Sequence, residues 1–267
     1  MFNNWREDRM GILDQLFRLD DKVAIVTGGG RGLGELMALS LAEVGAKVVV
    51  CSRKVEACEE TVRKIEEMGG QAIAMACDVT NIDQVENTVE KTIEHFGKID
   101  ILINNSGASW GASVLDMPHE AWDKVMNVNV NGIFYMSQAV GKHMVKQKGG
   151  KIINIASIAG LKGTDSEVLD AIGYNTSKGA VITFTKDLAA KWGKYNINVN
   201  AIAPGFFPTK MSKGVLATSQ QQILDHTPLG RLGTDTEIQG AALLLASKAS
   251  DYITGETISV DGGMNAV

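Results

Sequence analysis

Cysteine, proline and aromatic residues are scarce in this 267-residue chain. Its three cysteines form no CxxC pair, and its four histidines show no ligand spacing, so we expect neither a disulfide framework nor a metal site. With four prolines and no proline-rich stretch, the chain has no recognisable linker between domains. No apolar run approaches the roughly 18 residues that a membrane span requires.

Positive charge is not in excess either. The chain has 26 Lys and Arg against 31 Asp and Glu, a formal net charge of −5. A weakly acidic chain lacks the basic surface that binds nucleic acid or an anionic membrane, so neither is an expected partner. Residues 1–22 have mixed charges and lack the apolar core of a secretory signal, which predicts a cytoplasmic protein.

Short apolar runs rich in β-branched residues alternate with longer amphipathic stretches. Most of the short runs are apolar throughout, as in parallel strands that are covered on both faces. The expected strands are 23–27, 47–51, 72–76, 101–104, 151–155, 198–202 and 257–260, and the expected helices are 35–44, 55–68, 82–96, 119–146, 175–192 and 236–247. This alternation predicts an open α/β sheet of about seven strands with right-handed crossovers.

The chain reads as a single domain over residues 19–267, preceded by an N-terminal extension, residues 1–18. Apolar residues in the extension recur at roughly helical spacing, which predicts a helix that packs on this protein or on a sister subunit; binding to a surface is the alternative. Segments 161–173 and 205–234 fit neither pattern. Both follow expected strands, where open α/β sheets place their ligand sites.

A glycine-rich loop, Thr27 to Gly34, joins the first expected strand to the next helix in the pattern TGxxxGxG. Glycines allow the backbone to turn sharply and to approach a pyrophosphate, and the start of a helix supplies N–H groups and positive dipole. Leu33 stands where the pattern GxGxxG requires glycine. The loop is therefore a candidate phosphate-binding turn of a different spacing.

Three further segments complete a recognisable order. Asn104-Asn105-Ser106-Gly107 follows the fourth expected strand, the YxxxK pair Tyr174 and Lys178 comes after the fifth, and Pro204-Gly205 follows the sixth. Together with the glycine loop, they resemble the short-chain dehydrogenase/reductase family over residues 19–263, with gluconate 5-dehydrogenase-like and 3-oxoacyl-carrier-protein reductase-like members as the nearest groups. The resemblance implies a Rossmann-like doubly wound sheet with helices on both faces and a nicotinamide cofactor.

The end of the second expected strand bears on the choice of cofactor. In dinucleotide-binding folds an acidic residue there holds the ribose 2′-hydroxyl, whereas a basic residue accommodates a 2′-phosphate. This chain has Ser52 and Arg53 at that place and Arg31 in the glycine loop, all able to bind phosphate. We expect NADP(H) to be preferred, with NAD(H) possible; the alternative is that Arg53 and Lys54 only solvate a helix start.

Tyr174 and Lys178 stand four residues apart and share one face of the expected helix. A neighbouring ammonium should lower the pKa of a phenol from its usual value of about 10. The resemblance implies that Tyr174 is the general acid and base, that Lys178 lowers its pKa and holds the ribose, that Ser157 stabilises the alkoxide, and that Asn129 fixes a water. Ser166 and Ser177 are alternatives for the role of Ser157, and Asn127 and Asn131 adjoin Asn129.

The resemblance assigns further residues to the cofactor. Asp78 would accept from the adenine amino group beside Val79, although Asp78 or Thr80 could instead only cap the next helix. The full expected cofactor set is Gly28, Arg31, Gly32, Leu33, Gly34, Ser52, Arg53, Asp78, Val79, Asn105, Gly107, Tyr174, Lys178, Pro204, Gly205 and Thr209.

The expected reaction is hydride transfer between a ketone and a secondary alcohol of a small molecule. A sugar acid or polyol is the first expectation, a 3-oxoacyl thioester the alternative, and a non-catalytic NADP(H)-binding regulator a remote one. The acidic segment 161–173, longer than in most family members, would bind substrate hydroxyls or shape the pocket mouth, and 205–234 would be a mobile substrate loop. By analogy we expect a homotetramer, or a homodimer, formed through the helices 119–146 and 175–192.

Overall fold

One seven-stranded sheet organises the computed structural model, which describes residues 11–267. All neighbouring strands are parallel, in the order β3-β2-β1-β4-β5-β6-β7. The strands are β1 (Val23–Thr27), β2 (Lys47–Ser52), β3 (Gln71–Ala76), β4 (Ile101–Asn104), β5 (Gly150–Ile155), β6 (Ile197–Pro204) and β7 (Thr257–Val260). The strand order reverses between β1 and β4, and such a switch point opens a crevice at the carboxyl ends of the strands.

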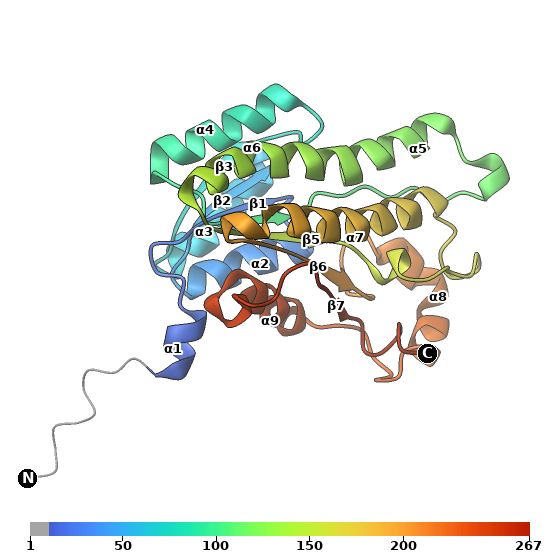
Figure 1. Ribbon diagram of the computed structural model, residues 1–267. Coiled ribbons are helices and arrows are strands. Elements are labelled where there is room, and N and C mark those ends of the chain that lie inside the picture. Colours follow the sequence, from blue (N-terminus) through green and yellow to red (C-terminus); the bar gives the residue numbers. More distant parts are fainter. Residues whose placement is uncertain (1–10) are drawn as a thin grey trace, which may run out of the picture.

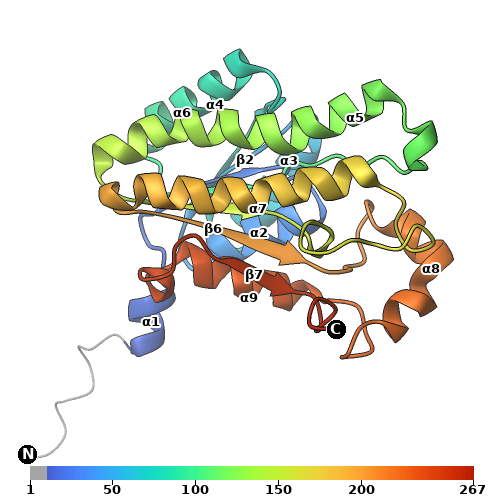
Figure 2. The same cartoon turned by 45° about the vertical axis from the view of Figure 1, so that its right-hand side comes forward.

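Helices cover both faces of the sheet (Figure 1). One layer contains α2 (Gly32–Glu43), α3 (Val55–Glu67) and α9 (Asp235–Ala246), and the other contains α4 (Ile82–Phe96), α6 (Gly132–Gln147) and α7 (Ile172–Trp192). α5 (His119–Met126) runs into α6, and the α5 end of this rod lies at the same end of the molecule as α8 (Lys213–Asp225) (Figure 2). The predicted doubly wound α/β fold is confirmed.

The strands are buried on both faces because successive side chains alternate between the two helical layers. In β1, Ala24 and Val26 pack into the cluster that contains α2 and α9, whereas Ile25 packs into the cluster that contains α4 and α6. All three side chains are fully buried. The apolar runs in the sequence reflect this burial on two sides.

Besides shifts of a few residues at helix ends, the structure differs from the expected helices at two places. The expected helix 119–146 is interrupted by a π-helical turn, η2 (Asn127–Asn131), between α5 and α6. The segment 205–234 contains the helix α8, which has a non-helical residue at Ser219 and only Ile223 buried. A helix that buries a single residue leaves little apolar periodicity in the sequence, which explains why the pattern did not reveal it.

The N-terminal extension is described from residue 11 onward. It contains a short helix, α1 (Ile12–Phe17), in which no residue is buried. The rest of the predicted helical extension, residues 1–10, lies outside the described residues. None of the helices in the described part of the chain is long and apolar enough to cross a bilayer.

Candidate active site

The glycine loop packs directly against the end of β4. Gly28 has a φ of +63°, and its N–H donates to Cys51 O at 2.7 Å. A Cβ at Gly34 would collide with Gly28 O and with the amide of Asn105. The absence of side chains therefore lets the first turn of α2 approach the ends of the strands, as a phosphate-binding turn requires.

Asn105 holds this loop in place. Its Nδ2 atom donates to the carbonyl oxygens of Thr27 and Gly28, each at 3.1 Å. The Thr27 hydroxyl in turn accepts from the backbone N–H groups of Asn105 and Ser106, each at 3.0 Å. The amide of Asn105 thus joins the end of β4 to the loop after β1. Its expected contact with the cofactor stays a prediction.

The basic residues expected at the cofactor ribose are unpaired. Within residues 11–267, neither Arg31 nor Arg53 forms an ion pair, and both are exposed. The hydroxyl of Ser52 donates to Lys54 O at 2.8 Å and accepts from the thiol of Cys58 at 3.1 Å. Free guanidinium groups and no carboxylate at the end of β2 fit a 2′-phosphorylated dinucleotide.

Asp78 shapes the turn after β3. Its Oδ1 atom accepts from the backbone N–H of Thr80 at 3.0 Å and from the Thr80 hydroxyl at 2.8 Å. Asn81 caps α4, because its side chain accepts from the N–H of Gln84 at 3.0 Å. The alternative in which Asp78 or Thr80 caps this helix is therefore wrong. Val79 is buried beside the turn.

Ser157, Tyr174 and Lys178 come together at the carboxyl end of β5. The Lys178 Nζ atom lies 5.5 Å from the centroid of the Tyr174 ring and donates to Ile155 O at 2.6 Å. The hydroxyl of Ser157 accepts from Ala159 N–H at 3.2 Å and hydrogen-bonds with the Tyr174 phenol. A phenol beside a hydroxyl donor and an ammonium can exchange a proton with a bound carbonyl or alcohol.

Burial dominates the electrostatics of this group. It raises the pKa of the Tyr174 phenol, and the hydrogen bond from Ser157 opposes that rise. Burial also lowers the pKa of Lys178 to about 8. In this structure the pKa of the phenol is raised and not lowered, because desolvation is the largest cause; the expected effect of Lys178 on this pKa stays a prediction.

Asn129 points inward from the π-helical turn and is fully buried. Its Oδ1 atom accepts from Ala108 N–H at 2.7 Å, and its Nδ2 atom donates to Ala108 O at 2.9 Å and to Ser177 Oγ at 2.8 Å. The neighbouring Asn127 and Asn131 are exposed or partly exposed and hydrogen-bond with each other at 2.9 Å. Of the three asparagines, Asn129 is the one that reaches α7, the helix that carries Tyr174 and Lys178.

The three candidate serines have different surroundings. Ser157 contacts Tyr174, whereas Ser166 is exposed within the segment 161–173. Ser177 is buried and engaged with Asn129. The sequence pointed to Ser177 only as an alternative for the role of Ser157. Ser177 stands three residues after Tyr174, and a serine at this spacing in a helix can donate its hydroxyl to the earlier backbone carbonyl.

The remaining expected cofactor residues lie around the same edge of the sheet. A Cβ at Gly32 would lie 3.8 Å from Thr209, so Thr209 adjoins the glycine loop. A Cβ at Gly107 would lie 3.6 Å from Asn129 Oδ1. Gly205 packs beside the end of β7, where a Cβ on it would lie 2.8 Å from Asp261 Cα.

Segment 161–173 forms hydrogen bonds with two other parts of the chain. Asp170 O accepts from Ala112 N–H at 3.0 Å, in the segment after β4. Glu167 O accepts from the hydroxyl of Ser219 on α8 at 3.3 Å. The acidic segment therefore contacts both the chain after β4 and the helix α8.

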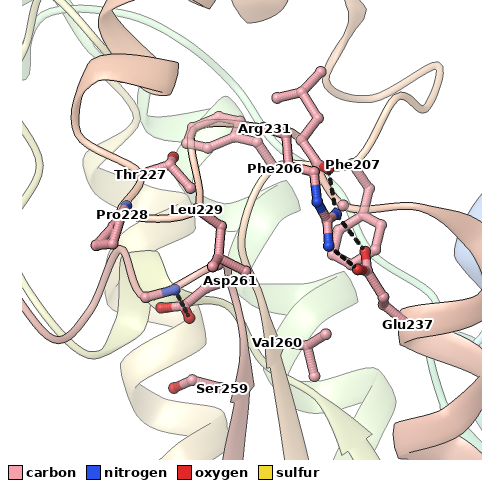
Figure 3. Close-up of a pocket in the computed structure, with 14 residues that line it drawn as sticks. Phe206, Phe207, Thr227, Pro228, Leu229, Arg231, Glu237, Ser259, Val260 and Asp261 are labelled. Carbon is pink, nitrogen blue, oxygen red and sulfur yellow. Dashed lines mark hydrogen bonds and ion pairs between the residues drawn. The ribbon is translucent and has the colours of Figure 1, made fainter.

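A cavity of about 460 Å³ opens beside Phe206 and Phe207 (Figure 3). Segments 206–207, 227–233 and 259–263 supply most of its lining, and none of the catalytic candidates contributes. Phe206 lines it and also packs into the apolar cluster of Ile158.

A parallel sheet with a glycine turn at its switch point and a buried tyrosine–lysine pair define the class of dinucleotide-binding oxidoreductases. Residues 28–265 match the family model described as enoyl-(acyl carrier protein) reductase. The chain belongs to the short-chain dehydrogenase/reductase family.

Similar proteins span nearly the whole chain. The 2-dehydro-3-deoxy-D-gluconate 5-dehydrogenase of Dickeya dadantii is 42% identical over 250 residues, covering 92% of this chain and 96% of that protein. A 3-oxoacyl-[acyl-carrier-protein] reductase of Thermotoga maritima is 37% identical over 247 residues, covering 92% and 99%. The crystal structure of a gluconate 5-dehydrogenase from Burkholderia cenocepacia in complex with NADP and tartrate has a TM-score of 0.90 at 37% identity, covering 96% and 100%.

Proposed function

We propose that the protein is an NADP(H)-dependent oxidoreductase that interconverts a ketone and a secondary alcohol of a sugar acid. The observation that carries the proposal is the contact of Ser157, Tyr174 and Lys178 at the carboxyl end of β5. Similarity to gluconate and ketogluconate dehydrogenases supports the substrate class.

The chain's own residues bind the substrate and move the proton. The cofactor, when bound, supplies or accepts the hydride at its nicotinamide ring. Tyr174 donates its phenol proton to the carbonyl oxygen during reduction and takes it back during oxidation. Ser157 donates to the developing oxyanion, and the ammonium of Lys178 favours the phenolate form once charge develops.

The unpaired guanidinium groups of Arg31 and Arg53 would hold the 2′-phosphate, and the glycine loop the pyrophosphate. Similar proteins crystallised with NADP support this choice of cofactor. Asn105 contributes indirectly, since it positions the loop through Thr27 and Gly28.

A 3-oxoacyl thioester reductase is the second candidate, favoured by similarity to acyl-carrier-protein reductases at 37–41% identity. An acyl carrier protein is acidic and would need free basic residues at its docking surface. A candidate docking patch is formed by Lys142, Lys146, Lys148 and Lys151. Two of these four lysines are engaged in ion pairs, Lys142 with Glu86 and Lys151 with Asp251. This observation favours the sugar acid.

The direct test follows reduced nicotinamide by absorbance with the purified chain. Ketogluconates and gluconates are compared with 3-oxoacyl thioesters, each with NADPH or NADP. We expect turnover with a sugar acid and a preference for the phosphorylated cofactor. Turnover confined to acyl thioesters would move the assignment to the second candidate, and cofactor binding without turnover on either class would favour a non-catalytic regulator.

A homotetramer, or a homodimer, in the cytoplasm is part of this proposal. The exposed fraction of Phe134 on α6 is 45%, an apolar side chain on one of the helices expected to form the interface. The molar mass in solution, measured by light scattering, tests it: the mass of a single chain would contradict the proposal.

A further inference from the structure

The hydroxyl of Ser177 joins the catalytic helix to the buried side chain of Asn129. Ser177 lies on α7, between Tyr174 and Lys178, and has no exposed surface. Its Oγ atom donates to Tyr174 O at 2.7 Å and accepts from Asn129 Nδ2 at 2.8 Å. One hydroxyl therefore contacts the backbone of the proposed acid and base and the side chain of a second site residue.

The other end of this network is the segment after β4. Asn129 binds both backbone groups of Ala108, with Oδ1 accepting at 2.7 Å and Nδ2 donating at 2.9 Å. The chain of hydrogen bonds from Ala108 through Asn129 and Ser177 to Tyr174 thus crosses three segments that are distant in sequence. A Cβ at Gly107, next to Ala108, would lie 4.0 Å from Lys178 Nζ, so the network runs beside the ammonium.

The network has no spare donor. An asparagine amide has two N–H donors, and those of Asn129 go to Ala108 O and Ser177 Oγ. The single hydroxyl proton of Ser177 goes to Tyr174 O. Removal of this hydroxyl would leave a fully buried N–H of Asn129 without a partner, which is costly enough to make the surrounding segments shift.

We propose that Ser177 is a positioning residue, whose hydroxyl sets the place of the first turn of α7 relative to Asn129. Ser177 does not touch the reacting atoms; it acts through Asn129 and through the backbone of Tyr174. The inference rests on the proposed role of Tyr174 and adds a residue on which the alignment of the phenol with Ser157 depends.

Ser137 offers a matched control. It is a buried serine on α6, and its Oγ accepts from the amide of Asn104 at 3.1 Å. That network continues through Asn154 to Thr185 rather than to Tyr174. Ser177→Ala and Ser137→Ala therefore each remove a buried hydroxyl that accepts from an asparagine amide, and only the first affects the backbone of the phenol-bearing residue.

The first experiment measures the ionisation of the phenol without any substrate. Isotope-labelled tyrosine is titrated by NMR, and Tyr174 is assigned by its loss in Tyr174→Phe. The titrating and donor groups beside this phenol are Lys178 and Ser157. We expect Ser177→Ala to raise the pKa of Tyr174, because the opposing hydrogen bond from Ser157 weakens, and Ser137→Ala to leave it unchanged.

The second experiment measures turnover and binding in the same variants. We expect Ser177→Ala to lower kcat about tenfold while the Kd for NADPH changes by less than about twofold, and Ser137→Ala to keep kcat. In an Asn129→Ala background the further loss on Ser177→Ala should be smaller, because the two residues act through one network.

Equal kcat and equal phenol titration in the two serine variants would overturn the proposal, as would fully additive losses with Asn129→Ala. An unchanged phenol pKa in Ser177→Ala overturns it even where no substrate is turned over. Failure of the wild-type chain to turn over any carbonyl contradicts the proposed function alone, because the NMR titration does not depend on turnover.

Discussion

The ammonium of Lys178 donates a 2.6 Å hydrogen bond to the carbonyl oxygen of Ile155. Ile155 is the last residue of β5, so this bond connects α7 to the end of a central strand. It is the only hydrogen bond of that ammonium within residues 11–267, and Lys178 is 4% exposed. One carbonyl does not replace a full hydration shell, which explains why burial lowers the pKa of Lys178 to about 8.

This lowered pKa makes stability depend on pH in a defined window. Lys178 has a pKa of about 8 when folded and 10.5 as its ordinary value. Between these values the unfolded chain binds more protons, so the free energy of unfolding should rise with pH, by roughly 2 kcal/mol between about pH 8 and about pH 10. Denaturant unfolding at a series of pH values measures it.

Lys178→Met removes the titrating group and should flatten this rise, whatever its effect on absolute stability. Lys191→Met is the control, because the side chain of Lys191 is 61% exposed and pairs with Asp187 on the same helix. The control should keep the wild-type slope. Equal slopes for Lys178→Met and the wild type would show that burial of Lys178 does not lower its pKa.

Loss of the phenol hydroxyl should stop the proton transfer and leave the fold intact. In Tyr174→Phe we expect kcat to fall by about 10²–10⁴, the usual contribution of a positioned acid or base. The Kd for NADPH, measured by fluorescence titration, should stay close to wild type. Tyr195→Phe is the control for loss of a tyrosine hydroxyl elsewhere; a comparable fall in kcat there, or substantial turnover in Tyr174→Phe, contradicts the assigned role.

Local patterns predicted much of this site. The seven-stranded α/β sheet followed from the alternation of apolar runs and amphipathic stretches, and the shared helical face of Tyr174 and Lys178 followed from their spacing. The roles of Asn105 and Ser177 did not, because Thr27 lies 78 residues from Asn105 and Asn129 lies 48 residues from Ser177. Such contacts depend on which strands are neighbours and on the extra residue of a π-helical turn, which no local pattern encodes.

The direction of the Tyr174 pKa illustrates a second limit. The four-residue spacing to Lys178 predicts a lowered pKa for Tyr174, because it indicates a nearby amine. The spacing contains no information on how much water the phenol loses on folding. In the structure the pKa is raised, with desolvation as the largest cause and the hydrogen bond from Ser157 opposing it. The spacing therefore predicted that Tyr174 and Lys178 lie close together, but not the direction in which the pKa of Tyr174 shifts.

Removal of the Arg53 guanidinium should change the choice of cofactor. Arg53 is exposed and forms no ion pair within residues 11–267, so Arg53→Ala should leave the stability of the fold unchanged. Loss of charge-assisted hydrogen bonds to a 2′-phosphate should raise the Kd for NADPH by about 10- to 100-fold and leave that for NADH unchanged. Lys54→Ala is the control; an equal effect of both variants on NADPH would indicate general electrostatic attraction instead of a phosphate contact.

A methyl group at Gly34 should disturb the glycine loop from within. The Cβ of Gly34→Ala would collide with Gly28 O and with the Asn105 amide, which is the group that holds the loop to β4. We expect a loss of about 1–3 kcal/mol in the free energy of unfolding, as for other overpacked sites, and weaker binding of NADPH.

Gly240→Ala is the control: Gly240 lies inside α9, and a Cβ on it would meet no atom within 4 Å. That variant should gain about 0.5–1 kcal/mol from helix propensity and bind NADPH normally. Denaturant unfolding and cofactor titration measure the free energy of unfolding and the Kd for NADPH in the two alanine variants. A Gly34→Ala protein with wild-type stability and affinity would show that the close packing of α2 on the loop is not required.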